Sequence, residues 1–302
     1  MYPQFGTGYV CRLFGKSRQG WHEQCEHSQE KSLAGIITVK LVKEIREKMP
    51  RIGTRKLLYM LQPTLKAHMI KIGRDNLYEL LGEHGLLLRY SRRRAYTTNS
   101  NHRFKKYPNL IRELIITQAG ELWVSDITYI ALAEGFCYMS IVTDVYSHKI
   151  VGHCLHPTLE SEGALTALSM ALLEKKRKGK LIHHSDRGVQ YCCTDYVLEL
   201  EGNHIRISMT ENGDPYENAI AERVNGILKS EHRMDQTFVS FEQAHQAAND
   251  AVNTYNNLRP HSSCDYMTPV VAHEQTGILN KRWKPKRWKK KVKTMQPETS
   301  EV

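Results

Sequence analysis

The chain has 302 residues, 40% of them hydrophobic, and a formal net charge of +11. This length accommodates two domains, one of them with a sizeable core. No apolar run approaches the ~20 residues that a membrane-spanning helix needs, and the N-terminus lacks the apolar segment of a signal peptide. These features exclude an integral membrane protein and predict a cytoplasmic one whose seven cysteines are reduced thiols.

The charge is distributed unevenly along the chain. Residues 40–106 hold 17 Lys and Arg against 5 Asp and Glu, and residues 281–302 hold 9 against 2. Residues 107–280 hold 13 against 22. A solvated surface is one interpretation. We favour the other, in which both ends bind a polyanion while the acidic middle binds cations.

The N-terminal part divides into two segments. Residues 1–36 show no clear periodicity and are treated as an N-terminal segment without a predicted element. Residues 37–90 have the apolar spacing of three helices. They fit a small all-α helix-turn-helix domain, in which Arg74 and Asn76 of the recognition element at 74–83 would contact DNA. A three-helix bundle that binds only protein is the alternative.

A basic linker follows over residues 91–109. It is rich in Arg, Lys, Ser, Thr and Asn and has no apolar period. Three consecutive arginines, Arg92, Arg93 and Arg94, could follow a phosphate backbone, although a plain solvated linker explains the composition nearly as well.

Residues 110–278 are predicted to form an α/β core with a C-terminal helix. The β-branched and aromatic runs predict strands at 122–130, 136–144, 150–156, 181–185 and 205–208. Helical spacing predicts helices over 161–178 and over 194–201, the latter with Thr194 as its N-cap. From periodicity alone the fold class is α/β with a mixed sheet.

Three carboxylates stand out in this core. Asp126 lies within the first strand, where an unpaired buried acid is costly unless a cation compensates it. Asp186, in the stretch HHSDRGVQY, follows a short apolar strand and precedes Gly188, which places it at the tip of a loop where it can bind a hard cation. Glu222 lies on an amphipathic helix, and Lys229 follows two helical turns along the same face.

Thirty-five residues separate Asp186 from Glu222. Together with the stretches HHSDRGVQY, YENAIAER and YNNLRPHSS, this spacing resembles the catalytic core of transposases and retroviral integrases. The resemblance is specifically to the second-frame product of insertion sequence family three, and it covers nearly the whole chain. It implies a ribonuclease-H-like core with Asp126, Asp186 and Glu222 as catalytic and metal-binding residues.

The resemblance also implies an activity. It is that of a DNA transposase, which cleaves the ends of its element and joins them to target DNA. The implied mechanism is phosphoryl transfer with two Mg²⁺ ions per site, or Mn²⁺ in their place. Lys229 would contact the transferred end. His184 would lie just behind the metal ligands or serve the fold only, and Asp144 would orient backbone or basic groups.

Three further segments have a predicted role. Residues 208–218 are rich in turn formers and should form a mobile loop at the rim of the site. Arg259, in YNNLRPHSS, either contacts DNA or anchors its segment on the core, and we favour anchoring. The tail at 279–302 includes Lys289 and Lys290 in a basic run that also holds Trp283 and Trp288, which suits nonspecific DNA contact, with a plain solvated tail as the alternative.

The expected partners are double-stranded DNA, as element ends and as target, and further copies of the chain assembled on that DNA. A product of the upstream frame, separate or fused by frameshifting, is also expected, but no membrane. The location would be the bacterial cytoplasm, at the nucleoid. Two alternatives remain: an integrase or nuclease of another mobile element, and an inactive or regulatory DNA-binding remnant.

Overall fold

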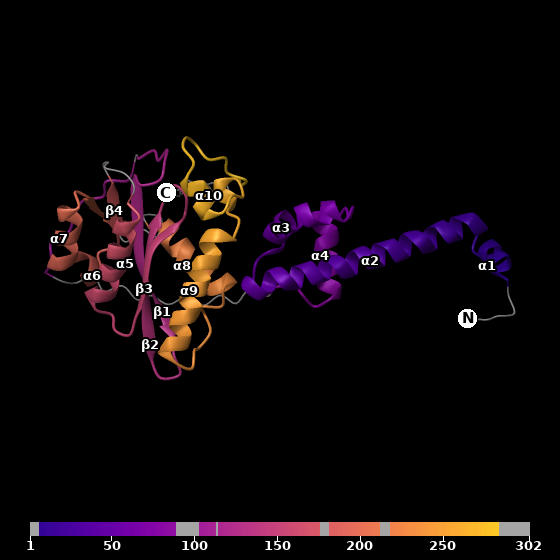
Figure 1. Ribbon diagram of the computed structural model, residues 1–302, viewed down its shortest axis with the longest axis horizontal. Coiled ribbons are helices and arrows are strands. Elements are labelled where there is room, and N and C mark those ends of the chain that lie inside the picture. Colours follow the sequence, from indigo (N-terminus) through magenta and orange to yellow (C-terminus); the bar gives the residue numbers. More distant parts are fainter. Residues whose placement is uncertain (1–5, 89–102, 113, 176–180, 212–217, 284–302) are drawn as a thin grey trace, which may run out of the picture.

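A computed structural model describes residues 6–88, 103–112, 114–175, 181–211 and 218–283 of the chain. They form an elongated helical region, built from the N-terminal residues, and an α/β core (Figure 1). None of the described helices combines the length and the hydropathy needed to span a membrane.

The helical region consists of α1 (Thr7–Leu13), α2 (Arg18–Lys48), α3 (Thr54–Ala67) and α4 (Arg74–Glu83). Both α1 and the first half of α2 fall where the sequence predicted no element, so that prediction is wrong there. The physical reason is visible in Figure 1: this half of α2 extends away from the rest of the molecule, so few packing partners impose an apolar stripe on it.

The second half of α2 packs with α3 and α4 around a small core of its own. Its centre consists of fully buried aliphatic side chains from all three helices, Val42, Leu57, Leu61, Leu77 and Leu81. The three helices predicted for residues 37–90 are therefore present, and the N-terminal helical region of the fold is confirmed.

The core is organised on a five-stranded sheet with the order β3-β2-β1-β4-β5. Its strands are β1 (Leu122–Ala131), β2 (Phe136–Asp144), β3 (Ile150–His156), β4 (Ile182–Ser185) and β5 (Arg206–Met209). The β2 strand is antiparallel to β1 and β3, whereas β4 is parallel to β1 and β5. The predicted α/β core with a mixed sheet is confirmed.

Helices cover both faces of this sheet (Figure 1). One face packs against α5 (Ser161–Leu173), α6 (Val189–Cys192) and α7 (Thr194–Gly202), and the other against α8 (Ala219–Glu231) and α9 (Phe241–Asn257). Cys193, not Thr194, is the N-cap of α7, so the predicted cap is wrong by one residue. The chain then continues through a 3₁₀ turn (Ser262–Cys264) and α10 (Pro269–His273).

Side-chain alternation along β1 decides which residues meet which helices. Trp123 belongs to the apolar cluster under α5 and α7, whereas Ile130 belongs to the cluster under α8 and α9. Because side chains on a strand alternate with period two, the even-numbered Asp126 points to the same face as Ile130. The sheet therefore aims this carboxylate at α8.

The helical region and the core are joined by defined contacts. The backbone N–H of Arg51 donates to the carbonyl of Glu231, at the end of α8, over 3.0 Å. The Arg51 side chain pairs with Asp235 at 2.8 Å, and the rings of Tyr59 and Tyr266 stack with centroids 4.7 Å apart. These contacts tie α3 and the turn before it to the end of α8 and to the segment after the 3₁₀ turn.

Candidate active site

Asp126 lies on β1 at the point where its neighbour β4 ends. Pairing of β1 with β4 stops at Val124, two residues earlier, while the β1–β2 ladder continues past Asp126. One carboxylate oxygen accepts from the backbone N–H of Ile127 at 2.9 Å, and the other from Nδ2 of Asn225 at 2.8 Å. The carboxylate is thus held by its own strand and by α8.

Asp186 follows the last residue of β4. Since β4 runs parallel to β1, its carboxyl end delivers Asp186 to the same side of the sheet as the open part of β1. The Asp186 carboxylate accepts from the N–H of Gly188 at 3.0 Å. A Cβ on Gly188 would lie only 3.0 Å from that carboxylate oxygen, so glycine provides the space for this turn.

Glu222 lies in the first turn of α8, and its side chain is exposed. The buried face of the helix includes Val224 and Leu228, and at the same depth the polar Asn225. Asn225 is the site residue that the sequence reasoning missed. A signal was available, because an asparagine three residues after Glu222 interrupts an otherwise apolar stripe.

The electrostatics connect the three acids. Burial, then the charge of Asp186 and more weakly that of Glu222, raise the pKa of Asp126 to about 7, against the hydrogen bonds from Asn225 and Ile127. Burial also raises the pKa of Glu222. The carboxylates are therefore close enough for the ionised form of one to disfavour that of another.

Lys229 is part of the same electrostatic environment. Burial lowers the pKa of its ammonium group, and the charges of Asp126 and Asp235 oppose that shift. Lys229 is thus a half-buried cation within electrostatic range of Asp126, two turns from Glu222 along α8.

This donor set fits a hard divalent cation. Carboxylate oxygens are the ligands that Mg²⁺ and Mn²⁺ take, and a cation would relieve the repulsion that raises the Asp126 pKa. Among the described residues, however, the three carboxylates do not offer oxygens that all lie within 4.8 Å of one another. The three carboxylates therefore do not form a ready ligand set for a single ion.

Two other predicted residues support the sheet. His184 is buried, and its Nδ1 lies 2.8 Å from the hydroxyl of Ser208, which links β4 to β5. Asp144 is fully buried and accepts from the backbone N–H groups of Gly120 and Ser147 at 2.8 and 2.9 Å. It orients the backbone at the end of β2.

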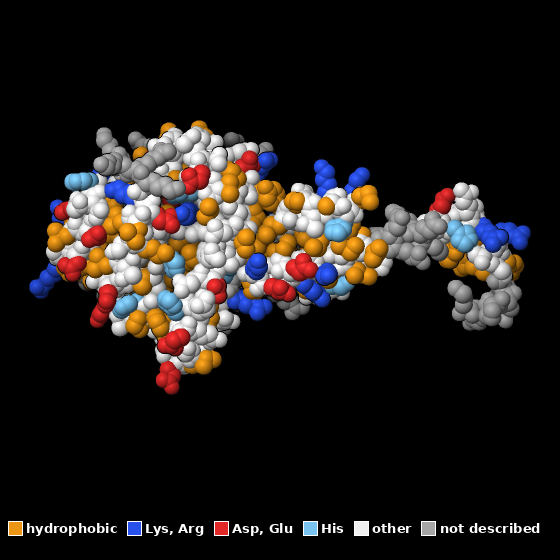
Figure 2. Space-filling view, viewed as in Figure 1, with side chains coloured by type: hydrophobic (Ala, Val, Ile, Leu, Met, Phe, Trp, Pro, Cys, Tyr) orange, Lys and Arg blue, Asp and Glu red, His pale blue; other side chains and the backbone are white. Residues whose placement is uncertain are grey.

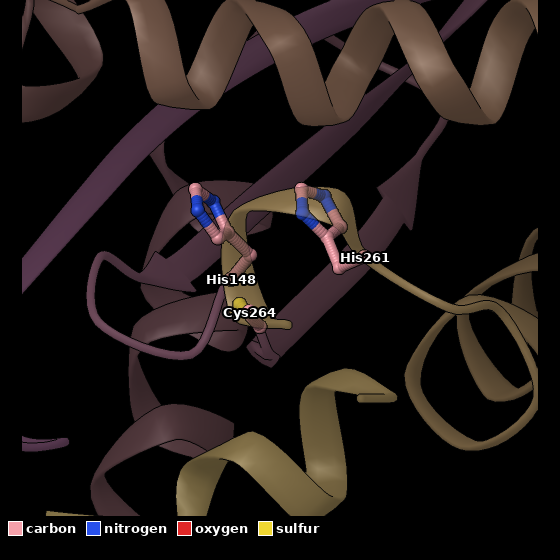
Figure 3. Close-up of side chains that lie close together, drawn as sticks. All are labelled: His148, His261 and Cys264. Atoms are coloured by element: carbon pink, nitrogen blue, oxygen red, sulfur yellow. The ribbon is translucent and has the colours of Figure 1, made fainter. Parts of the chain in front are cut away.

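A second cluster of metal-ligand side chains lies away from these acids. His148, His261 and Cys264 bring their ligand atoms within 4.8 Å of one another (Figure 3). The two imidazoles are stacked, with centroids 4.4 Å apart and planes at 12°. In-plane lone pairs of parallel rings do not converge on one ion. Burial, and further the charge of Arg259, lower the pKa of both histidines, so this cluster packs as neutral rings.

Arg259 is buried on the core instead of being exposed to solvent. Its side chain is 1% exposed, and its Nε and Nη2 donate to the two carboxylate oxygens of Glu231 at 2.8 and 2.9 Å. Lys56 of α3 reaches the same carboxylate at 2.8 Å. The arginine anchors its segment on α8, which is the alternative that the sequence favoured.

The other predicted DNA contacts are only partly within the described residues. Arg74 and Asn76 are exposed on α4, and Arg74 pairs with Asp75 at 2.8 Å. Outside the described residues lie Arg92, Arg93 and Arg94 of the linker, Lys289 and Lys290 of the tail, and residues 212–217 of the predicted rim loop.

Comparisons with known proteins agree with this architecture. Two family models, both described as integrase core domain, match residues 116–215 and 203–269. The chain is 33% identical over 270 residues to the "Insertion element IS600 uncharacterized 31 kDa protein" of Shigella sonnei, covering 88% of this chain and 98% of that protein. It is 28% identical over 273 residues to the transposase InsF for insertion sequence IS3A of Escherichia coli K12, covering 88% and 93%.

Among solved structures, a chain in the simian T-cell lymphotropic virus intasome bound to PP2A regulatory subunit B56 gamma is 19% identical, with a TM-score of 0.47 and 81% of each chain covered.

The matches first define a class, the integrase core, whose members are polynucleotidyl transferases that act on DNA with a divalent metal. Because similarity to the IS600 protein and the IS3A transposase extends over nearly their whole lengths, the chain belongs to the transposases of insertion sequence family three (IS3). Its function is that of an insertion-sequence transposase, and the nuclease and remnant alternatives are not favoured.

Proposed function

We propose that Asp126, Asp186 and Glu222 are the catalytic carboxylates of this transposase and hold two Mg²⁺ ions, or Mn²⁺ in their place. One observation carries the proposal: β1 aims Asp126 at α8, where burial, then the charge of Asp186 and more weakly that of Glu222, raise its pKa to about 7. Such mutual repulsion is typical of acids arranged around a cation.

When bound, the divalent ions would stabilise the negative charge on the attacking and leaving oxygens of an in-line displacement at phosphorus. The chain's own residues would position the substrate. Asn225 fixes the orientation of Asp126 through its 2.8 Å hydrogen bond. Lys229 would bind the phosphate backbone of the transferred end. Attack by water on the phosphorus cleaves the element end, and attack by a DNA 3′-OH transfers the strand. In both cases the bond between the phosphorus and the leaving oxygen breaks as the new phosphorus–oxygen bond forms.

The remaining parts of the chain would hold the DNA. We propose residues 37–90 as a helix-turn-helix-like domain that contacts the element end through Arg74 and Asn76 of the exposed face of α4. The linker at 91–109 and the tail at 279–302 would add nonspecific phosphate contacts. Residues 110–278 would form the catalytic domain, with residues 1–36 preceding both.

The proposed partners are the element ends and the target, both double-stranded DNA, and further copies of this chain on that DNA. An upstream-frame product, separate or fused, would complete the assembly. Since the relatives come from bacteria, we infer that the protein works on the chromosome in the bacterial cytoplasm.

The test is cleavage and joining of a labelled duplex that carries the element's own ends, with Mg²⁺ or Mn²⁺ and the upstream-frame product. Asp186→Asn and Glu222→Gln should abolish both products while DNA binding is kept. Asp195→Asn, which removes an exposed acid on α7, is the matched control and should retain activity. Cleavage retained in either carboxylate variant would refute the assignment of the three acids. Metal-dependent nicking without joining would instead indicate a nuclease.

A further inference from the structure

A groove lies at the junction between the helical region and the core, and the proposed chemistry does not use it. Its volume is about 690 Å³. The helical region contributes Lys43, Arg46 and Arg51 to its lining, and the core contributes Arg233, which follows the end of α8. The groove is therefore formed by both parts of the molecule.

The lining is strongly basic. Four cationic side chains face a single acidic one, Glu47. Two of these cationic side chains also have a structural role, since Arg46 donates to the carbonyl of Leu86 at 2.6 Å and Arg51 pairs with Asp235. Within the described parts of the chain, Lys43 and Arg233 are exposed and form no ion pair, so their charges are available to a ligand.

The two walls are fixed relative to each other. The N–H of Arg51 bonds to the carbonyl of Glu231, two residues before Arg233, and Lys56 pairs with the Glu231 carboxylate. The stacked rings of Tyr59 and Tyr266 add a contact on the same joint. The groove thus keeps its basic side chains in place before any ligand arrives, which lowers the entropic cost of binding.

The helix α8 leads from the candidate carboxylates to this groove. Nine residues separate Glu222 from Glu231, the last residue of α8, which at a rise of 1.5 Å per residue is about 14 Å. Arg233 follows two residues later, outside the helix, which places it about 14–17 Å from Glu222 along the α8 axis. Lys229 lies between them, so basic side chains continue along the helix. Since base pairs of a duplex are spaced by about 3.4 Å, this distance corresponds to about five base pairs.

We propose that this groove binds the phosphate backbone of duplex DNA about five base pairs from the phosphate at the carboxylates, with Lys43 and Arg233 on its opposite walls. The proposal rests on the proposed catalytic role of Asp126, Asp186 and Glu222, because the base pairs are counted from the phosphate at these carboxylates. Charge complementarity selects the ligand: an open, basic groove in line with Lys229 matches a continuous polyanion. Figure 2 shows Lys and Arg side chains gathered where the end of α2 meets the core.

The experiment measures DNA binding by fluorescence anisotropy with Lys43→Gln, Arg233→Gln and the double variant, in the full chain. Arg206→Gln is the matched control, because Arg206 is an exposed arginine on β5, at the edge of the sheet away from α8. Each groove variant should weaken binding of an end duplex about threefold to tenfold and reduce the salt slope by about one. The control should bind like wild type.

A second measurement locates the contact. Single neutral methylphosphonates are placed at successive positions from the cleaved phosphate. In the wild type, affinity should fall when the modification lies about four to six base pairs away. In the double variant that loss should vanish while losses at other positions persist. Thermal unfolding of each variant verifies the fold.

Wild-type affinity in the groove variants, or a loss that does not depend on the position of the methylphosphonate, would overturn the groove assignment. The failure of the proposed function is distinguishable, because it would appear as cleavage that is absent in the wild type or persists in Asp186→Asn. The groove variants leave those carboxylates intact.

Discussion

The Arg259→Met variant should have a lower free energy of unfolding than the wild type, while its affinity for DNA should be unchanged. The guanidinium is 1% exposed and donates to both oxygens of Glu231 at 2.8 and 2.9 Å. Removing one partner of a buried ion pair typically costs about 3–5 kcal/mol, and here Arg259→Met leaves the Glu231 carboxylate with Lys56 as its remaining cationic partner among the described residues. We therefore expect the free energy of unfolding to fall by about that amount.

The pKa of Glu231 supports this magnitude. Burial alone would raise it, but the hydrogen bonds and charge of Arg259, followed by those of Lys56, outweigh burial and lower the pKa from 4.5 to about 2. That difference corresponds to about 3 kcal/mol. The pKa of Lys56 is lowered as well, because burial and the charge of Arg259 outweigh the attraction of Glu231. The two hydrogen bonds from Arg259, one to each carboxylate oxygen, identify it as the main partner of Glu231.

Lys56→Met is accordingly the matched control, with an expected cost of only about 0–1 kcal/mol, since Glu231 keeps both hydrogen bonds from Arg259 and the variant no longer has to bury the Lys56 ammonium group. Urea denaturation of the wild type, both single variants and the double variant gives the coupling between the two sites. The reasoning is refuted if Lys56→Met costs as much as Arg259→Met. A lower salt slope for DNA binding in a folded Arg259→Met variant would restore Arg259 as a DNA contact.

Three further outcomes follow from the packing and the charges. Gly152→Ala would place a Cβ 2.0 Å from a carbonyl oxygen of α5, so it should cost at least about 3 kcal/mol in urea denaturation. Gly202→Ala, which meets nothing within 4 Å, should cost almost nothing. Asn225→Leu removes the donor to Asp126 and should slow single-turnover cleavage about tenfold to a hundredfold, with DNA affinity unchanged as the check on folding. The lowered pKa of Glu231 makes its contribution complete above pH about 4.5, and the contribution should be lost as the pH falls toward about 2. In the Glu231→Gln variant the free energy of unfolding should therefore fall less steeply with decreasing pH below about 4.5 than in the wild type. An unchanged decrease would contradict the role of the Glu231 carboxylate in stability.

The strands were predictable because burial on both sides leaves a strong composition signal. The bounds of β2 and β3 agree with the sequence prediction, and β1 differs by one residue. Asp126 was conspicuous for the same reason, as a charge within a run of β-branched and aromatic residues. The strand order needed more than periodicity, since alternation reports which face a residue occupies and not which strand lies beside it.

The parts that escaped prediction lack a local signal. The first half of α2 is a helix without a regular apolar stripe, because little packs against it in the described structure. The cap of α7 was missed because no side-chain hydrogen bond marks it. For Arg259 the sequence favoured anchoring on the core but did not reveal the partner, because Glu231 lies 28 positions away.

Two of the candidate carboxylates, Asp126 and Glu222, differ in how firmly the fold holds their side chains. Asp126 lies within the β1–β2 ladder and accepts a hydrogen bond from Asn225, whereas Glu222 lies in the first turn of α8 with an exposed side chain. Asp126 is therefore fixed by the sheet, whereas the exposed Glu222 side chain can change its conformation without disturbing the core. Asp126 is thus the fixed point of the proposed carboxylate site. We expect a change on β1 to displace the whole proposed site, and a change at the first turn of α8 to affect mainly Glu222.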